Sequence, residues 1–252
     1  MFLAVDIGNT NITIGLFDNN ELVETHRLES HEYNDDFDFA SELRAIVSGK
    51  TIEGCVVESV VDELTFSVRQ SCNRVVGVNS IILTPDSNTG IGLKVDKPHT
   101  IGADRLANVI CAAAKYHLPA IVVDIGTAIT FDVLDKGKNF IGGVIMPGVN
   151  MGIKALAEGT SKLTEIELDN SPAAIGDTTE TCILSGVVRG TACAIEGLLT
   201  QCETELGEKA TVIVTGGQAE LLTEYMSRKP DFINKNLTLE GLYYYHLRAQ
   251  QH

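Results

Sequence analysis

Positive charge is in short supply in this chain. Its 252 residues include 19 Lys and Arg against 34 Asp and Glu, which gives a formal net charge of −15 and a pI near 4.7. Binding to nucleic acid or to acidic lipid requires clustered positive charge. The composition therefore argues against a nucleic-acid partner or a membrane-surface partner.

The sequence also lacks paired cysteines of the kind that bind zinc or carry out redox chemistry. None of its six cysteines forms a C-x-x-C pair, and no His follows at zinc-finger spacing. Most of them lie in apolar surroundings, so we expect reduced, buried thiols in a reducing compartment. The cysteines are Cys55, Cys72, Cys111, Cys182, Cys193 and Cys202.

Long apolar runs, leader signals and linkers are missing as well. No apolar run approaches the ~20 residues that span a bilayer, and the first strand begins without a basic segment or a cleavage site. No Gly/Ser-rich or low-complexity tract divides the chain. We therefore expect a cytoplasmic protein whose parts form one compact unit.

The common nucleotide and catalytic motifs are absent. Gly49-Lys50-Thr51 ends like a P-loop, but the required first glycine is replaced by Arg44 and the preceding run is helical in character. No G-x-G-x-x-G follows a strand, and neither H-E-x-x-H nor G-x-S-x-G occurs. None of these motifs can be the basis of a site.

What the chain does contain is one stretch repeated twice. Residues 3–18 read LAVDIGNTNITIGLFD and residues 121–135 read IVVDIGTAITFDVLD. Asp6 aligns with Asp124 at an offset of 118 (124 − 6), and Thr13 aligns with Thr130 at an offset of 117 (130 − 13). Each copy has the pattern of a β-hairpin, with a turn one residue shorter in the second copy. Repetition of a whole unit predicts a duplicated fold.

The repeated turn combines a carboxylate, a glycine and free backbone amides. Glycine lets the backbone approach a ligand closely, and consecutive amides can hold phosphate oxygens. A single strand followed by Asp-x-Gly is more often an ordinary turn, but two copies at nearly one offset favour a function. The pattern predicts two phosphate-binding hairpins that face each other across a nucleotide cleft.

The order of predicted elements gives the fold class. Periodicity and turn residues place strands at about 21–28, 52–58 and 79–84, with helices at about 39–48 and 62–73. After the first hairpin this makes a βββαβαβ half, and the second hairpin begins another. We expect an α/β, duplicated actin-like (ribonuclease H-like) fold with halves at 1–117 and 118–252. Later elements are predicted as a helix after Gly102, a strand at 138–146, helices at 148–158 and about 178–206, a strand at 210–216 and a C-terminal helix.

Three aspartates and several glycines are candidates for chemistry. Asp104 lies in Gly-Ala-Asp-Arg at a helix start, where it either serves the helix dipole or accepts a hydroxyl proton in phosphoryl transfer. Asp6 and Asp124 suit cations, because hard cations prefer carboxylate and carbonyl oxygen. Glycines near strand ends could line an adenine or ribose site, and each could equally be an ordinary turn; they are Gly142, Gly143, Gly148, Gly216 and Gly217.

A set of short motifs, in order along nearly the whole chain, resembles the type III pantothenate kinase family. The most specific pair is D-x-G-N-T with G-A-D-R. The set comprises Asp6-x-Gly8-Asn9-Thr10, Gly102-Ala103-Asp104-Arg105, Asp124-x-Gly126-Thr127-Ala128, Gly142-Gly143 with Pro147-Gly148, Thr160-x-Lys162-Leu163 and Leu237-Thr238-Leu239-Glu240-Gly241-Leu242.

The resemblance implies a function and site residues. Members of the family are typically homodimers that transfer the γ-phosphoryl group of ATP to the terminal hydroxyl of pantothenate, the first step of coenzyme A synthesis. It implies Asp104 as general base, Asp124 as ligand of K⁺ or NH₄⁺, and Mg²⁺ with the ATP. Pantothenate would contact Gly102, Ala103, Asp104, Arg105 and Thr179, with Thr178 as the alternative to Thr179. ATP would contact Asp6, Ile7, Gly8, Asn9, Thr10, Asn11, Ile12, Thr13 and Thr127.

The sequence departs from the family pattern at two places. Val95 stands where many members have a Tyr that helps to bind substrate, and the usual S-S-V-V-P run reads Glu58-Ser59-Val60-Val61-Asp62. A non-catalytic relative that acts in gene expression is the main alternative function, and a sugar kinase or exopolyphosphatase is a weaker one. Retention of all three aspartates favours the kinase.

The helix at about 178–206 predicts a protein–protein contact. It has more apolar surface than one face needs, so part of it is expected to pack on a second subunit. The alternative is burial between the two halves of the same chain. The apolar residues are Ile183, Leu184, Val187, Val188, Ile195, Leu198 and Leu199.

Overall fold

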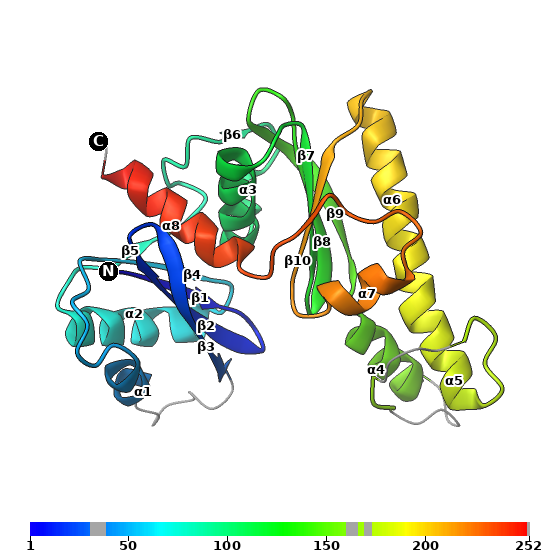
Figure 1. The fold of residues 1–252 in the computed structure, drawn as a ribbon, viewed down its shortest axis with the longest axis horizontal. Coiled ribbons are helices and arrows are strands. Elements are labelled where there is room, and N and C mark those ends of the chain that lie inside the picture. Colours follow the sequence, from blue (N-terminus) through cyan, green and yellow to red (C-terminus); the bar gives the residue numbers. More distant parts are fainter. Residues whose placement is uncertain (31–38, 160–165, 169–172, 251–252) are drawn as a thin grey trace. The chain divides into compact units, whose positions relative to one another are not determined.

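The computed structural model describes residues 1–30, 39–159, 166–168 and 173–250. The chain forms two compact units, Met1–Tyr116 with Asn236–His252 and His117–Lys235 (Figure 1). Each unit has its own sheet and its own hydrophobic core. The expected α/β architecture with two sheets is confirmed.

The first unit is built on a sheet of strand order β3-β2-β1-β4-β5. β2 is antiparallel to β1 and β3, whereas β4 is parallel to β1 and β5. Its elements are β1 (Phe2–Ile7), β2 (Asn11–Asp18), β3 (Glu21–Glu29), α1 (Phe39–Ile46), β4 (Gly54–Ser59), α2 (Asp62–Val76), β5 (Ile81–Ile82), β6 (Gly92–Leu93), a 3₁₀ turn (Pro98–Thr100), α3 (Ala103–Lys115) and α8 (Leu237–Ala249).

Side chains along β1 alternate between the two faces of the sheet. One face packs in the hydrophobic core, and the other is available for a site. Leu3, Val5 and Ile7 are completely buried and pack in the core under α1 and α2. Because successive side chains of a strand point to opposite faces, Asp6 lies on the other face of the sheet. Helices α3 and α8 cover that other face (Figure 1).

The five strands of the second unit repeat the same order, β9-β8-β7-β10-β11, within a six-stranded sheet. β8 is antiparallel to β7 and β9, and β10 is parallel to β7 and β11. The shared order is the duplication that the repeated hairpin predicted. The elements are β7 (Ala120–Ile125), β8 (Ala128–Leu134), β9 (Asn139–Pro147), α4 (Val149–Gly159), α5 (Thr179–Leu184), a π turn (Ser185–Arg189), α6 (Gly190–Leu206), β10 (Thr211–Thr215), α7 (Ala219–Tyr225) and β11 (Phe232–Ile233).

The C-terminal helix belongs to the first unit, whereas the sequence placed it in a half at 118–252. The aromatic ring of Phe2 stacks on His246 of α8 with ring centroids 4.4 Å apart, and Phe17 stacks on Tyr243 at 4.6 Å. Gly241 lies so close to Ala107 of α3 that any Cβ there would clash with the Ala107 carbonyl. This close contact between two helices is possible only because residue 241 is a glycine.

The long helix of the second unit and the edge strand β5 also differ from expectation. A π turn interrupts the predicted continuous helix, and Gly190 N–H donates to the carbonyl of Ser185 across it. β5 covers two residues rather than the predicted 79–84, because the Ser80 amide donates to the Asn73 side chain at 2.7 Å instead of to a strand.

The segment Thr179–Leu206 is long and apolar enough to cross a bilayer by length and composition alone, which the sequence analysis did not anticipate. Its residues Val188, Ala192 and Leu199 are nevertheless part of the core of the second unit. A helix that buries one face against a sheet in this way is a core helix of a globular domain.

Glu203 at the end of α6 fixes the start of β10. Its carboxylate accepts two hydrogen bonds from the Arg228 guanidinium at 2.7 and 2.8 Å and one from the Ala210 amide at 3.2 Å. Burial raises the pKa of Glu203, but these bonds and the one from Lys209 outweigh it and lower the pKa to about 2. The ionised carboxylate binds the Ala210 amide just before β10. It therefore helps to hold β10 in the register that places Thr215 beside Asp124.

The cysteines are only partly as expected. All six are free, but Cys182 and Cys193 are exposed, while Cys55, Cys72 and Cys111 are buried.

Candidate active site

The turn of the first hairpin, Gly8 to Thr10, is held from outside by Ser30. Within the turn, the Gly8 amide donates to the Asn11 carbonyl at 2.9 Å. Ser30 donates its hydroxyl to the Gly8 carbonyl at 2.6 Å and its amide to the Thr10 carbonyl at 2.9 Å. Ser30 thus engages two carbonyls of a turn whose tip is exposed, and consecutive amides in such a turn can hold phosphate oxygens. The role of Ser30 was not visible in the sequence, where it reads as part of a polar loop.

Asp6 lies at the carboxyl end of β1 in a row of four polar residues that runs across the sheet. Its direct cross-strand neighbours are Thr13 on β2 and Glu58 on β4, and Thr13 in turn is paired with Arg27 on β3. Residues at one register level of a sheet share a face. The row therefore lies on the face that α3 and α8 cover, at the strand ends where α/β proteins bind ligands.

The charge of Asp6 is controlled by this row and by Asp104. Burial raises the pKa of Asp6 above its ordinary value, while the neighbouring Glu58 side chain works against that rise. The negative charge of Asp104 raises the pKa of Asp6 further, and Arg27 lowers it. Asp6 of the first hairpin and Asp104 of the Gly-Ala-Asp-Arg segment are therefore close enough in the first unit for their charges to interact.

Asp104 occupies the first turn of α3, as the sequence predicted. Gly102 is the N-cap residue and contributes no side chain, so Asp104 Oδ1 accepts the Arg105 amide at 2.7 Å instead. A Cβ on Gly102 would clash with that same oxygen. Burial raises the pKa of Asp104 above its ordinary value, although Arg105 works against the rise. A carboxylate with a raised pKa is better suited to accept a hydroxyl proton near neutral pH.

The second hairpin places Asp124 in an equivalent row. Its cross-strand neighbours are Thr130 on β8 and Thr215 on β10. The turn is two residues long, and the Gly148 amide donates to the Thr127 carbonyl at 3.1 Å. A Cβ on Gly148 would clash with the carbonyls of this turn. The backbone at Gly148 thus packs closely against the second turn, which is possible because Gly148 has no side chain.

Gly216 closes the other side of the same turn. Its φ is +94°, and an added Cβ would lie 2.5 Å from the Ile125 carbonyl oxygen and 2.6 Å from Asp124 Oδ1. Both the backbone conformation and the close approach therefore demand glycine. Of the predicted glycines, Gly148 and Gly216 contact this site, whereas Gly142 adopts φ +130° beside a β-bulge at Val133 and Leu134.

The donor set around Asp124 fits a hard cation. One carboxylate, the hydroxyls of Thr130 and Thr215, and nearby backbone carbonyls are all oxygen donors, which K⁺, NH₄⁺ and Mg²⁺ prefer to nitrogen or sulfur. Across the residues that the structure describes, no group of three His, Cys, Asp or Glu could enclose a metal ion. A weakly held cation with one protein carboxylate suits these residues better than a closed metal centre.

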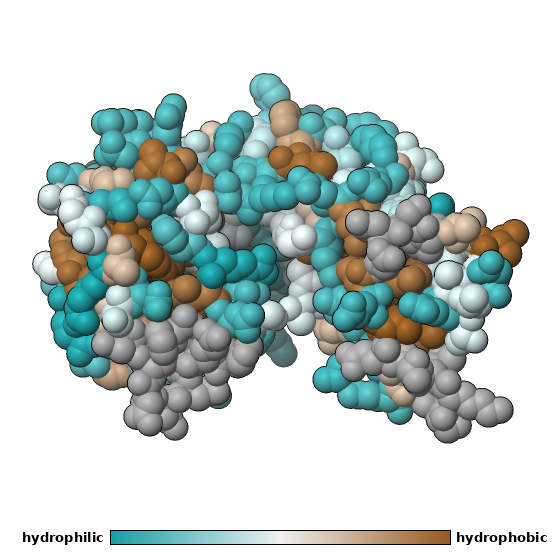
Figure 2. Space-filling model, turned by 60° about the horizontal axis from the view of Figure 1, so that its bottom comes forward, coloured by the Kyte–Doolittle hydropathy of each residue, from teal (hydrophilic) through white to brown (hydrophobic). Residues whose placement is uncertain are grey.

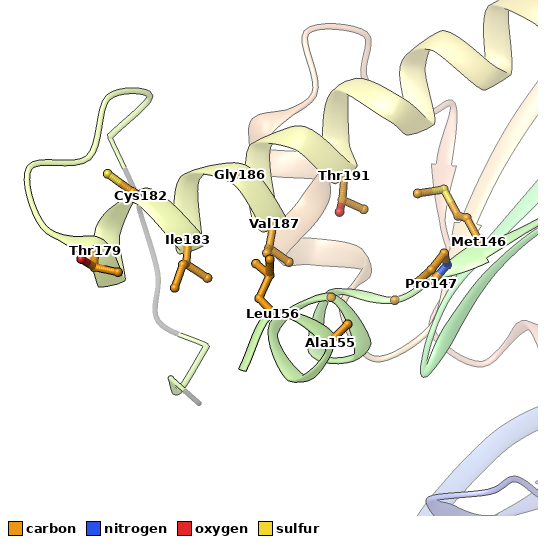
Figure 3. Close-up of a pocket in the computed structure, with 12 residues that line it drawn as sticks. Met146, Pro147, Ala155, Leu156, Thr179, Cys182, Ile183, Gly186, Val187 and Thr191 are labelled. Atoms are coloured by element: carbon orange, nitrogen blue, oxygen red, sulfur yellow. The ribbon is translucent and has the colours of Figure 1, made fainter. Parts of the chain in front are cut away.

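An apolar cavity of about 750 Å³ lies next to this turn in the second unit. Gly148, which binds the Thr127 carbonyl, is one of its lining residues. Figure 3 shows Ile183 and Val187 of the long helix pointing towards Leu156 of α4 on its opposite wall.

The two candidate threonines at the start of α5 have different surroundings. Thr178 is the N-cap, and its hydroxyl accepts the Thr181 amide at 3.1 Å in a capping box. Thr179 lines the apolar cavity (Figure 3). Because the Thr178 hydroxyl is already engaged in the cap, Thr179 is the better placed of the two to contact a ligand.

The predicted site residues fall into two groups, one in each unit. The hairpin from Asp6 to Thr13 and the segment from Gly102 to Arg105 lie in the first unit, and Asp124, Thr127 and Thr179 lie in the second. The motif Thr160-x-Lys162-Leu163 lies outside the described residues. Glu58, the direct cross-strand neighbour of Asp6, was not among the predicted site residues, although a glutamate after the apolar run of β4 was a visible signal.

The twofold repeat of one strand order, with an aspartate and a glycine turn at the end of each central strand, defines an actin-like fold of the class that includes kinases and ATPases. The sequence pattern of the family "Type III pantothenate kinase" matches residues 2–201. The chain is also 35% identical over 256 residues to the type III pantothenate kinase of Exiguobacterium sp. (strain ATCC BAA-1283 / AT1b), covering 100% of both chains. The chain belongs to the type III pantothenate kinase family.

Two solved structures show the same fold. One is a Baf family transcriptional activator from Campylobacter jejuni, with a TM-score of 0.65, 19% identity and 100% coverage of both chains. The other is the activator of 2-hydroxyisocaproyl-CoA dehydratase from Clostridium difficile with bound ADPNP, with a TM-score of 0.59, 14% identity and coverage of 99% and 96%. Identities this low speak for the fold alone, so the first match gives no support to a role in gene expression.

The close packing of Gly216 against the second turn predicts that Gly216→Ala impairs use of ATP. The added Cβ would push on the Ile125 carbonyl and on Asp124, so KM for ATP should rise strongly. Gly207→Ala is the matched control, because Gly207 has φ +72° but nothing within 4 Å of an added Cβ. It should cost only the left-handed strain of about 1–2 kcal/mol. Steady-state kinetics and melting curves of both variants give the comparison; equal ATP kinetics would contradict the role of the turn.

Proposed function

We propose that the protein phosphorylates the terminal hydroxyl of pantothenate with ATP, giving 4'-phosphopantothenate in the first step of coenzyme A biosynthesis, with Asp104 as the general base. Membership of the type III pantothenate kinase family supports this reaction over the full length of the chain. The assignment of Asp104 as the base is supported by two features of its carboxylate. It is partly buried, and its charge interacts with that of Asp6 at the end of β1.

The chemistry of phosphoryl transfer assigns a role to each group of site residues. The first hairpin, Asp6 to Thr13, and Thr127 bind ATP, with turn amides directed at phosphate oxygens. Asp104 accepts the proton of the substrate hydroxyl while its oxygen attacks the γ-phosphorus. The bond to the bridging oxygen of the β-phosphate breaks, and ADP leaves. Gly102, Ala103, Arg105 and Thr179 contact pantothenate.

Cations complete the charge balance near the phosphates. Asp124 holds a monovalent cation, K⁺ or NH₄⁺, and the oxygen donors around it support this assignment. Mg²⁺ arrives with ATP near Asp6 and keeps several of its waters, so it needs no cage of protein ligands. Both ions neutralise the negative charge that carboxylates and triphosphate bring together. The reaction takes place in the cytoplasm.

The active form is a homodimer. The long helix Thr179–Leu206 is apolar by composition, yet only 39% of its most apolar window is buried within the chain. On the same unit, α4 exposes Met151 and Leu156, next to the apolar cavity. Figure 2 shows hydrophobic residues, in brown, at the surface of the second unit. A second copy of the chain would cover this surface.

Asp104→Asn should keep the fold and lose turnover. The amide is nearly isosteric but cannot accept the hydroxyl proton, and a well-placed base contributes roughly 10²–10⁴-fold. In the parent enzyme, kcat/KM should fall as pH drops through the raised pKa of Asp104, because the protonated carboxyl is no base. The pH profile of ADP release by both proteins measures this. A variant as fast as the parent would reduce Asp104 to a helix-dipole residue.

Activity should depend on a monovalent cation through Asp124. We expect the parent enzyme to lose activity when K⁺ is replaced by Na⁺ at constant ionic strength, since Asp124 must be matched by a weakly hydrated ion. Asp124→Asn should be poor in both salts. If the parent enzyme is indifferent to the exchange, Asp124 is only a turn residue that accepts the amides of its own hairpin.

A positive charge introduced into the exposed apolar surface of α4 should prevent dimer formation. Leu156→Lys should convert the protein from a dimer to a monomer in light scattering at micromolar concentration. Phe66→Lys is the matched control, because Phe66 is an exposed apolar residue, 73% accessible, on α2 of the first unit. It should leave the dimer intact. A fully active parent protein that is monomeric at this concentration would contradict the dimer.

A further inference from the structure

Ser30 is a buried serine directly after β3, beside the turn of the first hairpin. Only 4% of its surface is exposed. Its hydroxyl donates to the Gly8 carbonyl at 2.6 Å, and its amide donates to the Thr10 carbonyl at 2.9 Å. One buried residue therefore holds the backbone on both sides of Asn9, which lies at the exposed tip of the turn.

The duplicated fold has a glycine at the equivalent place in the second unit. Gly148 follows β9 as Ser30 follows β3, and its amide donates to the Thr127 carbonyl at 3.1 Å. A Cβ on Gly148 would lie 2.4 Å from the carbonyl oxygens of both Gly126 and Thr127, so a side chain would clash there. In the first unit the turn is one residue longer, and at this place it accommodates a side chain that carries a hydrogen-bond donor.

The Ser30 hydroxyl also determines the direction of a backbone amide. The peptide group between Gly8 and Asn9 is planar and trans, so its carbonyl oxygen and its N–H point in opposite directions. Because the Gly8 carbonyl is held towards Ser30, the Asn9 N–H points away from Ser30. Amides held in fixed directions in a turn can bind an anion such as a phosphate group.

We propose that Ser30 is a positioning residue for ATP, whose hydroxyl holds the Gly8 carbonyl so that the Asn9 amide is presented to the phosphate oxygens. This inference rests on the proposed ATP-binding role of the first hairpin. Ser30 itself does not touch the nucleotide, because its hydroxyl is buried and donates to the turn. Without this hydrogen bond the peptide plane can rotate, and ATP binding must then supply the order that the free turn lacks.

Three substitutions separate positioning from general stability. Ser30→Ala removes the hydroxyl and keeps the amide that donates to Thr10, whereas Ser30→Thr keeps both donors. Ser80→Ala is the matched control. Ser80 is another buried serine of the first unit, 3% exposed, and its hydroxyl donates to the Asn73 side chain at 2.7 Å, between α2 and β5. This control removes a comparable hydrogen bond outside the first hairpin.

We expect Ser30→Ala to weaken the binding of a non-hydrolysable ATP analogue with Mg²⁺ by about 3- to 10-fold in calorimetry, the usual effect of losing one hydrogen bond between uncharged groups. KM for ATP should rise by the same factor, while KM for pantothenate should stay within about twofold. Ser30→Thr should bind the analogue as the parent protein does. Ser80→Ala should lower the melting temperature and leave binding of the analogue unchanged.

A second measurement needs no nucleotide. The NMR order parameter of the Asn9 amide should be lower in Ser30→Ala than in the parent protein and in Ser80→Ala, because only Ser30→Ala frees the peptide plane before Asn9. If the extra methyl group of Ser30→Thr prevents folding, this comparison and the calorimetry of the two alanine variants still decide between positioning and stability.

Two results would overturn the inference: a Ser30→Ala protein that binds the analogue as the parent protein does, and an equal loss of binding in Ser80→Ala. Calorimetry also distinguishes this failure from failure of the proposed function. A parent protein that binds the analogue but does not phosphorylate pantothenate contradicts the proposed reaction and leaves the test of Ser30 valid. A parent protein that does not bind the analogue contradicts the ATP-binding role of the first hairpin, and the role of Ser30 falls with it.

Discussion

The register between β1 and its two neighbours is the constraint on which the rest of the first unit depends. Leu3, Val5 and Ile7 are completely buried on one face of the sheet. Asp6 therefore lies on the other face. A slip of one residue would put the carboxylate into the apolar core and the core residues into the site. Alignment of Asp6 with Thr13 and Glu58 is therefore fixed by the burial of its neighbours and not by any contact with a ligand.

Duplication has produced two turns that are alike in topology and different in length. The first turn has three residues, of which Asn9 and Thr10 are exposed. The second has two, of which Thr127 is exposed, and Gly148 and Gly216 pack closely against its backbone. A longer turn can surround phosphate oxygens with amides, whereas a short turn lined with oxygen atoms suits a weakly hydrated cation. The one-residue difference in the repeat thus separates the two tasks proposed for the hairpins.

Local sequence patterns predicted much of the fold and the candidate site residues. The features that they did not predict depend on contacts between residues far apart in the chain. The hairpins, Asp6, Asp104 and Asp124 could be predicted, because strand alternation and turn chemistry act over a few residues. The return of α8 to the first unit could not, since it depends on Gly241 meeting a carbonyl more than a hundred residues away. The π turn at Ser185 and the pairing of Glu58 with Asp6 have the same origin. Each depends on a neighbouring residue in space that the hydrophobic periodicity of the sequence does not reveal.

The surroundings of the two carboxyl groups in the first unit support the proposal that Asp104, rather than Asp6, acts as the base. Burial raises the pKa of both carboxyl groups, so neither is disqualified by its basicity. They differ in what surrounds them. Asp6 has the buried Glu58 as its direct cross-strand neighbour, so two acidic side chains lie side by side at that position. The Asp104 carboxylate accepts the Arg105 amide on Oδ1, from the first turn of a helix. That bond orients Asp104 without supplying a transferable side-chain proton, so its basic lone pairs stay available to a substrate hydroxyl.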